Sequence, residues 1–172
     1  MKTLITLIFA LVIAGCASYD GRGLKPGISS GEDVIQLMGE PAMRWQEPDG
    51  GQLLAFPRGP AGFNTYMVTI AGNGLMSSLQ AVLNTKHFAL IREGMTEEQV
   101  LRILGPSTPQ WTVFFDRQNE LVWEWRFCNA WNEPSRFDVL FDGTTKRVRT
   151  TQSYPESMTM LVPPPPCGNQ TQ

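Results

Sequence analysis

Apolar and polar positions follow two alternating periods along this chain. Apolar residues recur at helical spacing from Val34 to Met38 and again from Val100 to Leu104. Each segment follows a residue that can cap a helix and ends at Gly: Ser29 or Ser30 and Gly39 in the first, Thr96 and Gly105 in the second. The pattern predicts two short helices, each of which needs an apolar surface to pack against.

Short β-rich runs follow each predicted helix, separated by Gly, Asn, Asp and Pro. They are QLLAF, NTYMVTI and LMSSLQAVL after the first helix, and ELVWEWRF, SRFDVLF and KRVRTTQSY after the second. Such runs are typical of antiparallel hairpins. We therefore expect an α+β fold, made of two tandem helix-plus-three-stranded antiparallel meander units that share a sheet or a core.

The repeat divides the chain into segments. Residues 27–90 form the first predicted unit and residues 91–155 the second, and 156–172 form a Pro-rich C-terminal tail. A single unit of this size buries little core, so the two units should pack together. Residues 16–26 are small and polar, as expected of a tether.

Residues 1–15 have the order of a secretory signal peptide: Lys2, an apolar run, then Ala and Gly before Cys16. The apolar run is shorter than the roughly 20 residues that span a bilayer. The segment resembles a bacterial lipobox, which implies cleavage before Cys16 and a covalent lipid on its thiol. Ala17 rather than Asp follows, so by analogy with such lipoproteins we expect outer-membrane anchoring that faces the periplasm. An ordinary signal peptide with a chance Cys is the alternative.

Net charge and cysteine content bear on three further properties: nucleic-acid binding, disulfide formation and metal binding. The chain has 14 basic and 16 acidic side chains, which is not the basic excess of a nucleic-acid-binding protein. In an oxidising compartment Cys128 and Cys167 are expected to form a disulfide, although two free thiols or pairing with another chain remain alternatives. Two Cys and the distant His87 do not have zinc-ligand spacing, so no metal or other cofactor is expected.

The two predicted helices carry a motif of known proteins. The segments "GMTEEQVLRILGP" and, more loosely, "GISSGEDVIQLMGEP", together with the lipobox, resemble the SmpA/OmlA (BamE-like) family of outer-membrane lipoproteins. The resemblance implies a protein-binding accessory in outer-membrane protein assembly or envelope integrity. In having two units the chain also resembles the β-lactamase inhibitory proteins, which present an aromatic-rich sheet to an enzyme.

Aromatic and basic residues are the candidate partner-binding groups. Trp123 and Trp125 alternate with polar residues, which favours packing beneath a helix over binding, whereas Trp131 lies in a loop and is the better contact candidate. Lys146, Arg147 and Arg149 could attract anionic lipid or an acidic partner, but charges that protect an edge strand from aggregation are the preferred interpretation. Trp45 and Trp111 follow their helices at equal distance and suggest a shared packing role.

Catalytic motifs find little support, and no catalytic residue is predicted. His87 has no nucleophile motif beside it, and the acid pairs Glu120/Glu124 and Asp138/Asp142 read equally well as surface acids. We expect a non-enzymatic lipoprotein that binds a periplasmic or outer-membrane protein. An inhibitor of a periplasmic or cell-wall enzyme is the second hypothesis and a cell-wall hydrolase the third. The sequence leaves the partner and the oligomeric state open.

Overall fold

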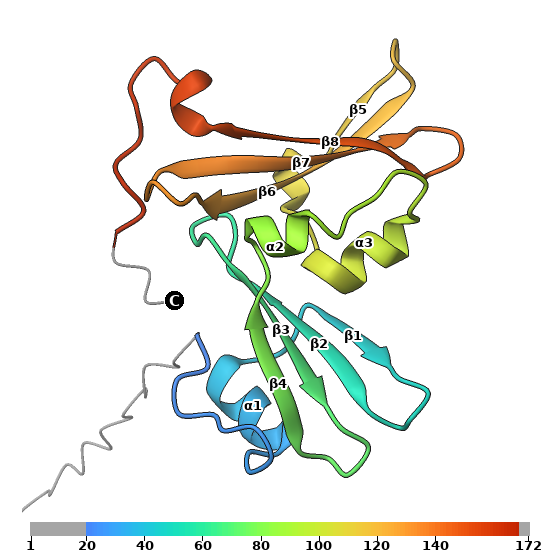
Figure 1. Cartoon of the computed structure of the whole chain (residues 1–172), viewed down its shortest axis with the longest axis vertical. Helices are drawn as coiled ribbons and strands as arrows, with labels where there is room; N and C mark the ends of the chain where they lie inside the picture. Colours follow the sequence, from blue (N-terminus) through green and yellow to red (C-terminus); the bar gives the residue numbers. More distant parts are fainter. Residues whose placement is uncertain (1–19, 169–172) are drawn as a thin grey trace, which may run out of the picture.

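The computed structural model describes residues 20–168 of the chain. The predicted signal peptide, Cys16 and its lipid lie outside these residues. Within the described range, no helix has the length and apolar character needed to cross a membrane. Eight strands form two separate antiparallel sheets, and in each sheet the strands follow chain order (Figure 1).

The first sheet is buried on both faces at its centre. Its strands are β1 (Met43–Gln46), β2 (Gln52–Pro57), β3 (Thr65–Ile70) and β4 (Met76–Ala81). Leu54 pairs with Val68 and Ala55 with Met67, and all four side chains are buried. Neighbouring residues of a strand point to opposite faces, so both faces of this sheet are covered by other elements.

The second sheet buries one face and carries polar side chains on the other. Its strands are β5 (Val113–Phe115), β6 (Glu120–Cys128), β7 (Pro134–Asp142) and β8 (Val148–Pro155). Trp125 pairs with Phe137 on the buried face, and Glu124 pairs with Asp138 on the other. The alternation recognised in residues 121–127 therefore holds across two strands.

The expected α+β fold of helix-plus-three-stranded units is wrong. Over residues 20–168 the chain is mostly β, with only 17% of these residues helical, and each half has four strands in a sheet of its own. The predicted runs cover all or most of each of the six longer strands, whereas β1 and β5 were missed. These two strands have four and three residues, too few for alternation to be recognised.

Both predicted helices form, with the expected caps. Ser30 Oγ accepts the Asp33 N–H at 3.1 Å at the start of α1 (Gly31–Met38), and Thr96 Oγ1 accepts the Gln99 N–H at 3.2 Å before α3 (Glu97–Leu104). The side chains of Asp33 and Gln99 in turn accept the backbone N–H of Ser30 and of Thr96, which completes a capping box at each helix. A third helix, α2 (Thr85–Phe88), lies in the connection between the two halves.

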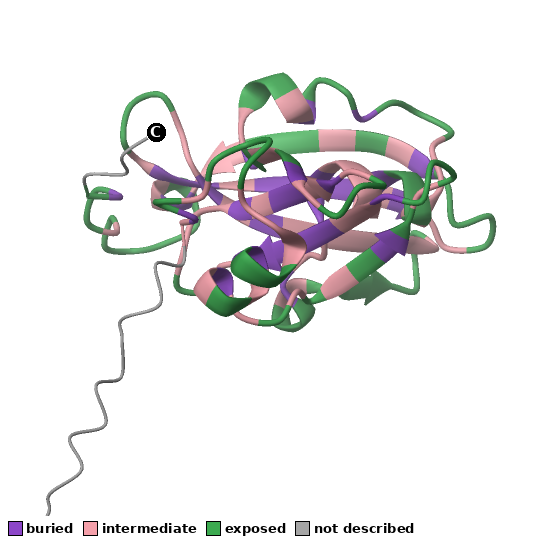
Figure 2. Ribbon diagram, turned by 90° about the horizontal axis from the view of Figure 1, so that it is seen from below, coloured by how far each residue is buried: buried purple, intermediate pink, exposed green. Residues whose placement is uncertain are grey.

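The two capped helices occupy different positions in the packing. Val34 and Met38 of α1 pack on one face of the first sheet, against Leu54, Phe56, Val68, Ile70 and Met76. Helix α3 lies between the two sheets (Figure 1). Its Val100 and Leu104 belong to a larger cluster with residues of both sheets: Trp45, Ala55, Met67, Trp125, Phe127, Phe137, Val139 and Phe141. Burial is accordingly concentrated along the strands in the interior (Figure 2).

The expected equivalence of Trp45 and Trp111 is also wrong. Trp45 lies in β1 and is buried in the central cluster, with the Arg102 guanidinium 5.7 Å from its ring centroid. Trp111 ends the short 3-10 helix η1 (Pro109–Trp111), and the Arg136 guanidinium lies 3.8 Å from its ring centroid. Equal spacing from the preceding helix therefore did not give the two indoles the same neighbours.

The C-terminal tail returns to the end of β6. After the 3-10 helix η2 (Glu156–Met158) the chain reaches Cys167, whose Cα lies 6.0 Å from that of Cys128 in a disulfide. The Cys167 N–H also donates to the Asn132 carbonyl at 3.1 Å. The tail is thus tied to the loop between β6 and β7, as the cysteine pairing predicted.

Candidate partner-binding surface

The three tryptophans proposed as contact residues have different surroundings. Trp125 is only 2% exposed and belongs to the central cluster, while Trp123 is partly buried with its ring 4.7 Å from the Phe141 ring. Both therefore pack in the interior, as their alternation favoured. Trp131 is 88% exposed and is the one of the three whose side chain is open to a partner.

The loop that carries Trp131 is held by several bonds. Asn129 Oδ1 accepts the backbone N–H of Trp131 at 2.8 Å and of Glu133 at 3.0 Å. The Asn129 amide donates to Ser135 Oγ at 3.0 Å, and the disulfide at Cys128 adds a covalent link. A loop fixed in this way presents an exposed indole with little conformational entropy left to lose on binding.

The three basic candidates do not form an open cationic patch. Arg149 Nη2 lies 2.5 Å from Asp142 Oδ2, and its Nη1 donates to the Gln118 carbonyl at 3.0 Å. Arg147 donates to the Gly94 carbonyl at 2.9 Å. Lys146 is exposed, with its Nζ 5.7 Å from the Phe114 ring centroid. The two arginines therefore have roles within the fold, and Lys146 is the group best placed to contact another molecule.

An apolar surface that sequence reasoning missed lies on the β5–β6 hairpin. Val113, Phe114 and Phe115 are consecutive in β5, and each is more than two-fifths exposed. We call these three residues the hairpin patch; Val113 and Phe115 point to one face of the strand and Phe114 to the other. In Figure 1 the hairpin projects from the second sheet on the side away from both described ends of the chain. The sequence signal was the unbroken apolar run before the polar turn "DRQNE".

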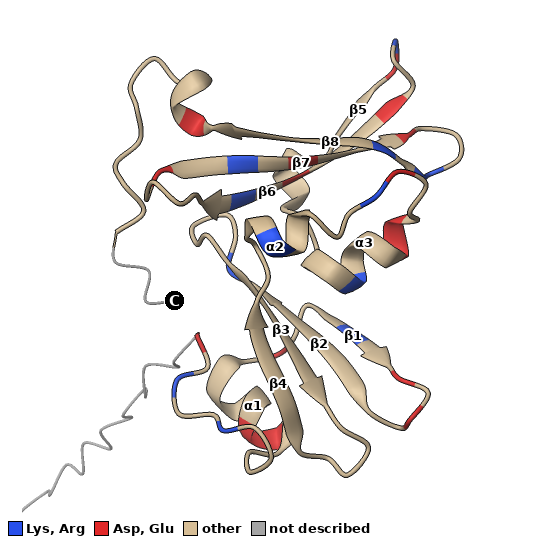
Figure 3. Ribbon diagram, in the orientation of Figure 1, with Lys and Arg blue, Asp and Glu red and all other residues tan. Residues whose placement is uncertain are grey.

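Charged side chains meet on the outer face of the second sheet. Glu156 is completely buried and accepts from Arg126 Nε and Nη2 at 2.6 and 2.8 Å, while Arg136 Nε lies 2.6 Å from the same carboxylate. Arg136 Nη1 also donates to Glu124 Oε1 at 2.6 Å. Figure 3 shows the neighbouring cationic segments on β6 and β7 and the acidic residue at the start of η2. We call Glu124, Arg126, Arg136, Asp138, Tyr154 and Glu156 the charged cluster.

Asp138 has an unusual environment within this cluster. It is 3% exposed; Gln152 Nε2 donates to its Oδ2 at 2.8 Å, and its Oδ1 has no hydrogen-bond partner. Burial raises the pKa of Asp138 to about 6; the neighbouring Glu124 carboxylate adds to the rise and the Gln152 hydrogen bond opposes it. The Tyr154 hydroxyl donates to Glu124 Oε2 at 2.9 Å, and burial together with this bond raises the pKa of Tyr154.

The four acids considered for hydrolysis are neighbours across β6 and β7, and the resulting pairs differ from the pairs within one segment that the sequence suggested. Glu124 lies opposite Asp138, and Glu120 lies opposite Asp142. The pKa of Asp142 is lowered, chiefly by the Thr145 N–H and by Arg149, so this carboxylate stays ionised. Asp138 is too buried to meet a polysaccharide, so the cross-strand acid pair does not present a hydrolytic site.

Among the described residues, His87 does not join Cys, Asp or Glu side chains in a group that could bind a metal ion. The His87 ring nitrogens lie 3.0 Å from Asn84 Oδ1 and 3.2 Å from Gln80 Oε1. Burial lowers the pKa of His87. Over residues 20–168, no group of three His, Cys, Asp or Glu side chains has the geometry to hold a metal ion.

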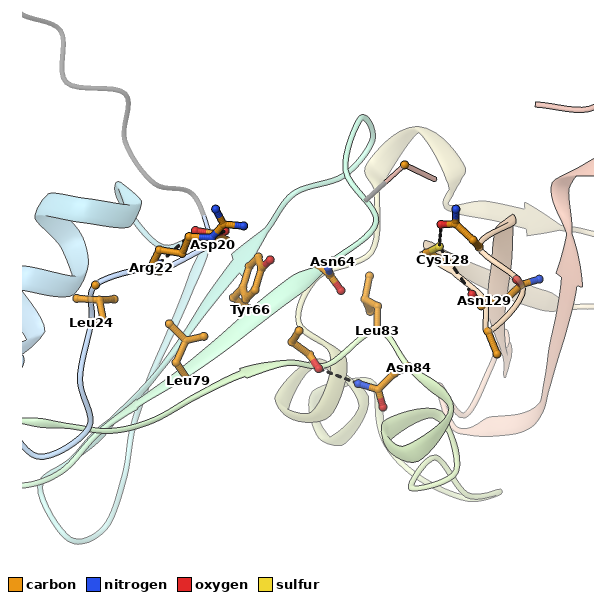
Figure 4. A pocket seen from close by; sticks show the side chains of 16 residues that line it. Asp20, Arg22, Leu24, Asn64, Tyr66, Leu79, Leu83, Asn84, Cys128 and Asn129 are labelled. Carbon is orange, nitrogen blue, oxygen red and sulfur yellow. Dashed lines mark hydrogen bonds and ion pairs between the residues drawn. The ribbon is translucent and has the colours of Figure 1, made fainter. Parts of the chain in front are cut away.

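Two cavities lie between the halves of the molecule. The larger, about 1030 Å³, is bounded by Tyr66 and Leu79 of the first sheet and by the loop after Cys128 (Figure 4). Asp20 and Gly168, where the described residues begin and end, are both in its wall. The smaller, about 320 Å³, lies between the β2–β3 loop, the segment after α3 and Trp125.

Among the candidate residues, the hairpin patch and the Trp131 loop remain open to a partner, at different ends of the second sheet. The tail also exposes apolar side chains, those of Met158, Met160, Leu161 and Val162. The interior tryptophans and the charged cluster are engaged within the fold. Comparison with known proteins finds no matching family model, curated protein or solved structure.

Proposed function

We propose that the chain is a lipoprotein, anchored through Cys16 in the outer membrane, that acts in the periplasm as a non-enzymatic protein-binding accessory. The signal-like residues 1–15 and the Cys that follows support the anchor. The observation that carries the binding role is the hairpin patch, with three consecutive apolar side chains open to solvent. Clustered exposed apolar side chains mark interaction sites more often than single ones do.

The position of the hairpin patch favours a protein partner over the bilayer. The chain enters the described fold at Asp20, and the hairpin projects on the other side of the molecule (Figure 1). A tether at the N-terminal end would therefore let the patch face the periplasm. Lys146 beside Phe114 adds one positive charge, which favours a partner with an acidic group at the rim of its apolar surface.

Site-specific photo-crosslinking tests this role. A crosslinker at position 113, on the same face of β5 as Phe115, should give one discrete adduct with a periplasmic or outer-membrane protein in intact envelopes. Because the contact is apolar, Phe115→Ser should weaken that adduct at least about tenfold. The measurement is adduct yield on a denaturing gel, with the partner identified by mass spectrometry.

Matched positions provide the control for this experiment. Ile28 and Leu90 are also exposed apolar residues but lie outside the second sheet. A crosslinker at position 28 should give no adduct, and Leu90→Ser should leave the position-113 adduct unchanged. Equal adducts from positions 28 and 113 would contradict the assignment of the patch.

The Trp131 loop favours a second candidate function, inhibition of a periplasmic or cell-wall enzyme. A fixed loop with an exposed indole has the form of an inhibitory segment that fills a pocket in its target. The loop between β2 and β3, which contains Gly59 and Pro60, is the other candidate inhibitory loop.

Enzyme assays separate this candidate from the first. Under it, the purified chain lowers the activity of a β-lactamase or a cell-wall hydrolase, and Trp131→Ala raises the inhibition constant about 30-fold or more. Phe115→Ser should leave inhibition unchanged, since the hairpin patch lies elsewhere. Unaltered activity across both enzyme classes would exclude inhibition of these targets.

A further inference from the structure

The smaller cavity has walls that are fixed before any ligand arrives. Four prolines line it: Pro57, Pro60, Pro106 and Pro109. Gly59 approaches Thr108 so closely that a Cβ at this position would lie 2.8 Å from Thr108 Oγ1. Proline fixes its own φ angle, so the two loops that meet here have little freedom to close the space. The cavity of about 320 Å³ is therefore a preformed feature of the junction between the halves.

The wall of this cavity is mostly apolar but includes the hydroxyls of Thr65, Ser107 and Thr108, the amide of Gln110 and one buried donor without a partner. The Trp125 indole is part of the wall, and its Nε1–H is buried without a hydrogen-bond partner. An indole nitrogen only donates, and a buried donor without an acceptor is unfavourable. The protein supplies no acceptor to this N–H, and the cavity that Trp125 lines is a space from which a ligand could supply one.

Charged ligands do not suit this site. Arg126 is the one ionisable residue in the wall, and its guanidinium is already paired with Glu156 and lies 4.5 Å from the Phe63 ring centroid. An anionic ligand would find no uncommitted cation, and a cation would find no carboxylate in the wall. The lining thus selects for a neutral molecule with an apolar body.

We propose that this cavity binds a small neutral molecule that has an apolar body and one carbonyl oxygen, with the oxygen accepting the Trp125 Nε1–H bond. The volume lies at the low end of small-molecule sites, which limits the ligand to a few heavy atoms beyond a single ring. The site is independent of the hairpin patch and of the Trp131 loop, so it adds a ligand to a protein proposed above to bind other proteins.

Two probes of the same shape test the proposal on the whole mature chain. Cyclohexanone carries the acceptor, and methylenecyclohexane replaces its oxygen with a CH₂ group. The ¹⁵N indole spectrum, with Trp125 assigned by Trp125→Phe, should show a saturable downfield shift of the Trp125 proton with cyclohexanone only. The proposal is wrong if the Trp125 indole resonance shifts in proportion to probe concentration without reaching a plateau, or if both probes shift it equally.

Variants distinguish the hydrogen bond from nonspecific partition. Trp125→Phe keeps an aromatic wall and should weaken cyclohexanone roughly tenfold by calorimetry, the value of one lost hydrogen bond. Trp123→Phe removes a neighbouring indole that is not part of this wall and should leave the affinity unchanged. If a bound water keeps its contact with the Trp125 proton at saturating cyclohexanone, the cavity is a hydration site and the proposal is wrong.

Discussion

Replacement of Glu156 by Gln is expected to lower the free energy of unfolding by about 3 kcal/mol. The carboxylate is completely buried and neutralises Arg126 and Arg136, with contacts of 2.6 to 2.8 Å. Those two arginines are directly opposite each other on β6 and β7. Like charges in that position repel, so removal of the shared acid leaves a partly buried repulsive pair in which Arg136 keeps its bond to Glu124 and Arg126 loses its carboxylate partner.

Chemical denaturation of the variant measures this loss. Glu98→Gln is the control, since Glu98 forms an exposed i to i+4 pair with Arg102 at 3.2 Å and should contribute less than about 1 kcal/mol. Adding Arg126→Gln to Glu156→Gln removes the repulsion and should recover part of the lost stability. A Glu156→Gln protein as stable as Glu98→Gln would show that the arginines do not depend on this acid.

The helix ends could be predicted from sequence because their signals are local. Thr96 and Gln99 have the residue types and the spacing of a capping box, and for the first helix the sequence left Ser29 and Ser30 as alternatives, of which the structure uses Ser30. The longer strands were found from β-rich runs, and in β6 the alternation also indicated that Trp125 is interior. Each of these inferences needs only a few neighbouring residues.

The charged cluster could not be predicted, because its contacts depend on strand register. Glu124 and Asp138 are 14 residues apart in sequence, and only the pairing of β6 with β7 brings them together. Glu156 reads as an ordinary acid in the tail until η2 places it over the arginines. The position of α3 between the sheets is likewise a property of the whole fold, since both helices have similar apolar faces in sequence.

Asp138→Asn is expected to stabilise the protein above about pH 6, by up to about 3 kcal/mol. The pKa of Asp138 is raised from 3.8 to about 6 in the folded state, chiefly by burial. Above pH 6 the carboxylate is charged in both states, and the folded state bears the unfavourable desolvation. Below about pH 4 it is protonated in both states, so the group's unfavourable contribution grows as the pH rises from 4 to 6.

The amide of Asn fits the same contacts. Its oxygen can accept from Gln152 as Asp138 Oδ2 does, and its NH₂ takes the place of Oδ1, which has no partner. The NH₂ group then faces Glu124, the acid that lies opposite. Asn thus supplies a donor where the wild type places a second negative charge.

Thermal unfolding from pH 4 to pH 8 tests this prediction, and Asp142→Asn supplies a control of opposite sign. The pKa of Asp142 is lowered from 3.8 by the Thr145 N–H and by Arg149, so this variant should be destabilised throughout pH 4 to 8 and approach wild type only below about pH 4. The two difference curves should therefore have opposite signs at neutral pH. A destabilised Asp138→Asn protein at pH 7.5 would mean that the ionised carboxylate is favourable where it lies, and that its neighbours solvate it better than an amide.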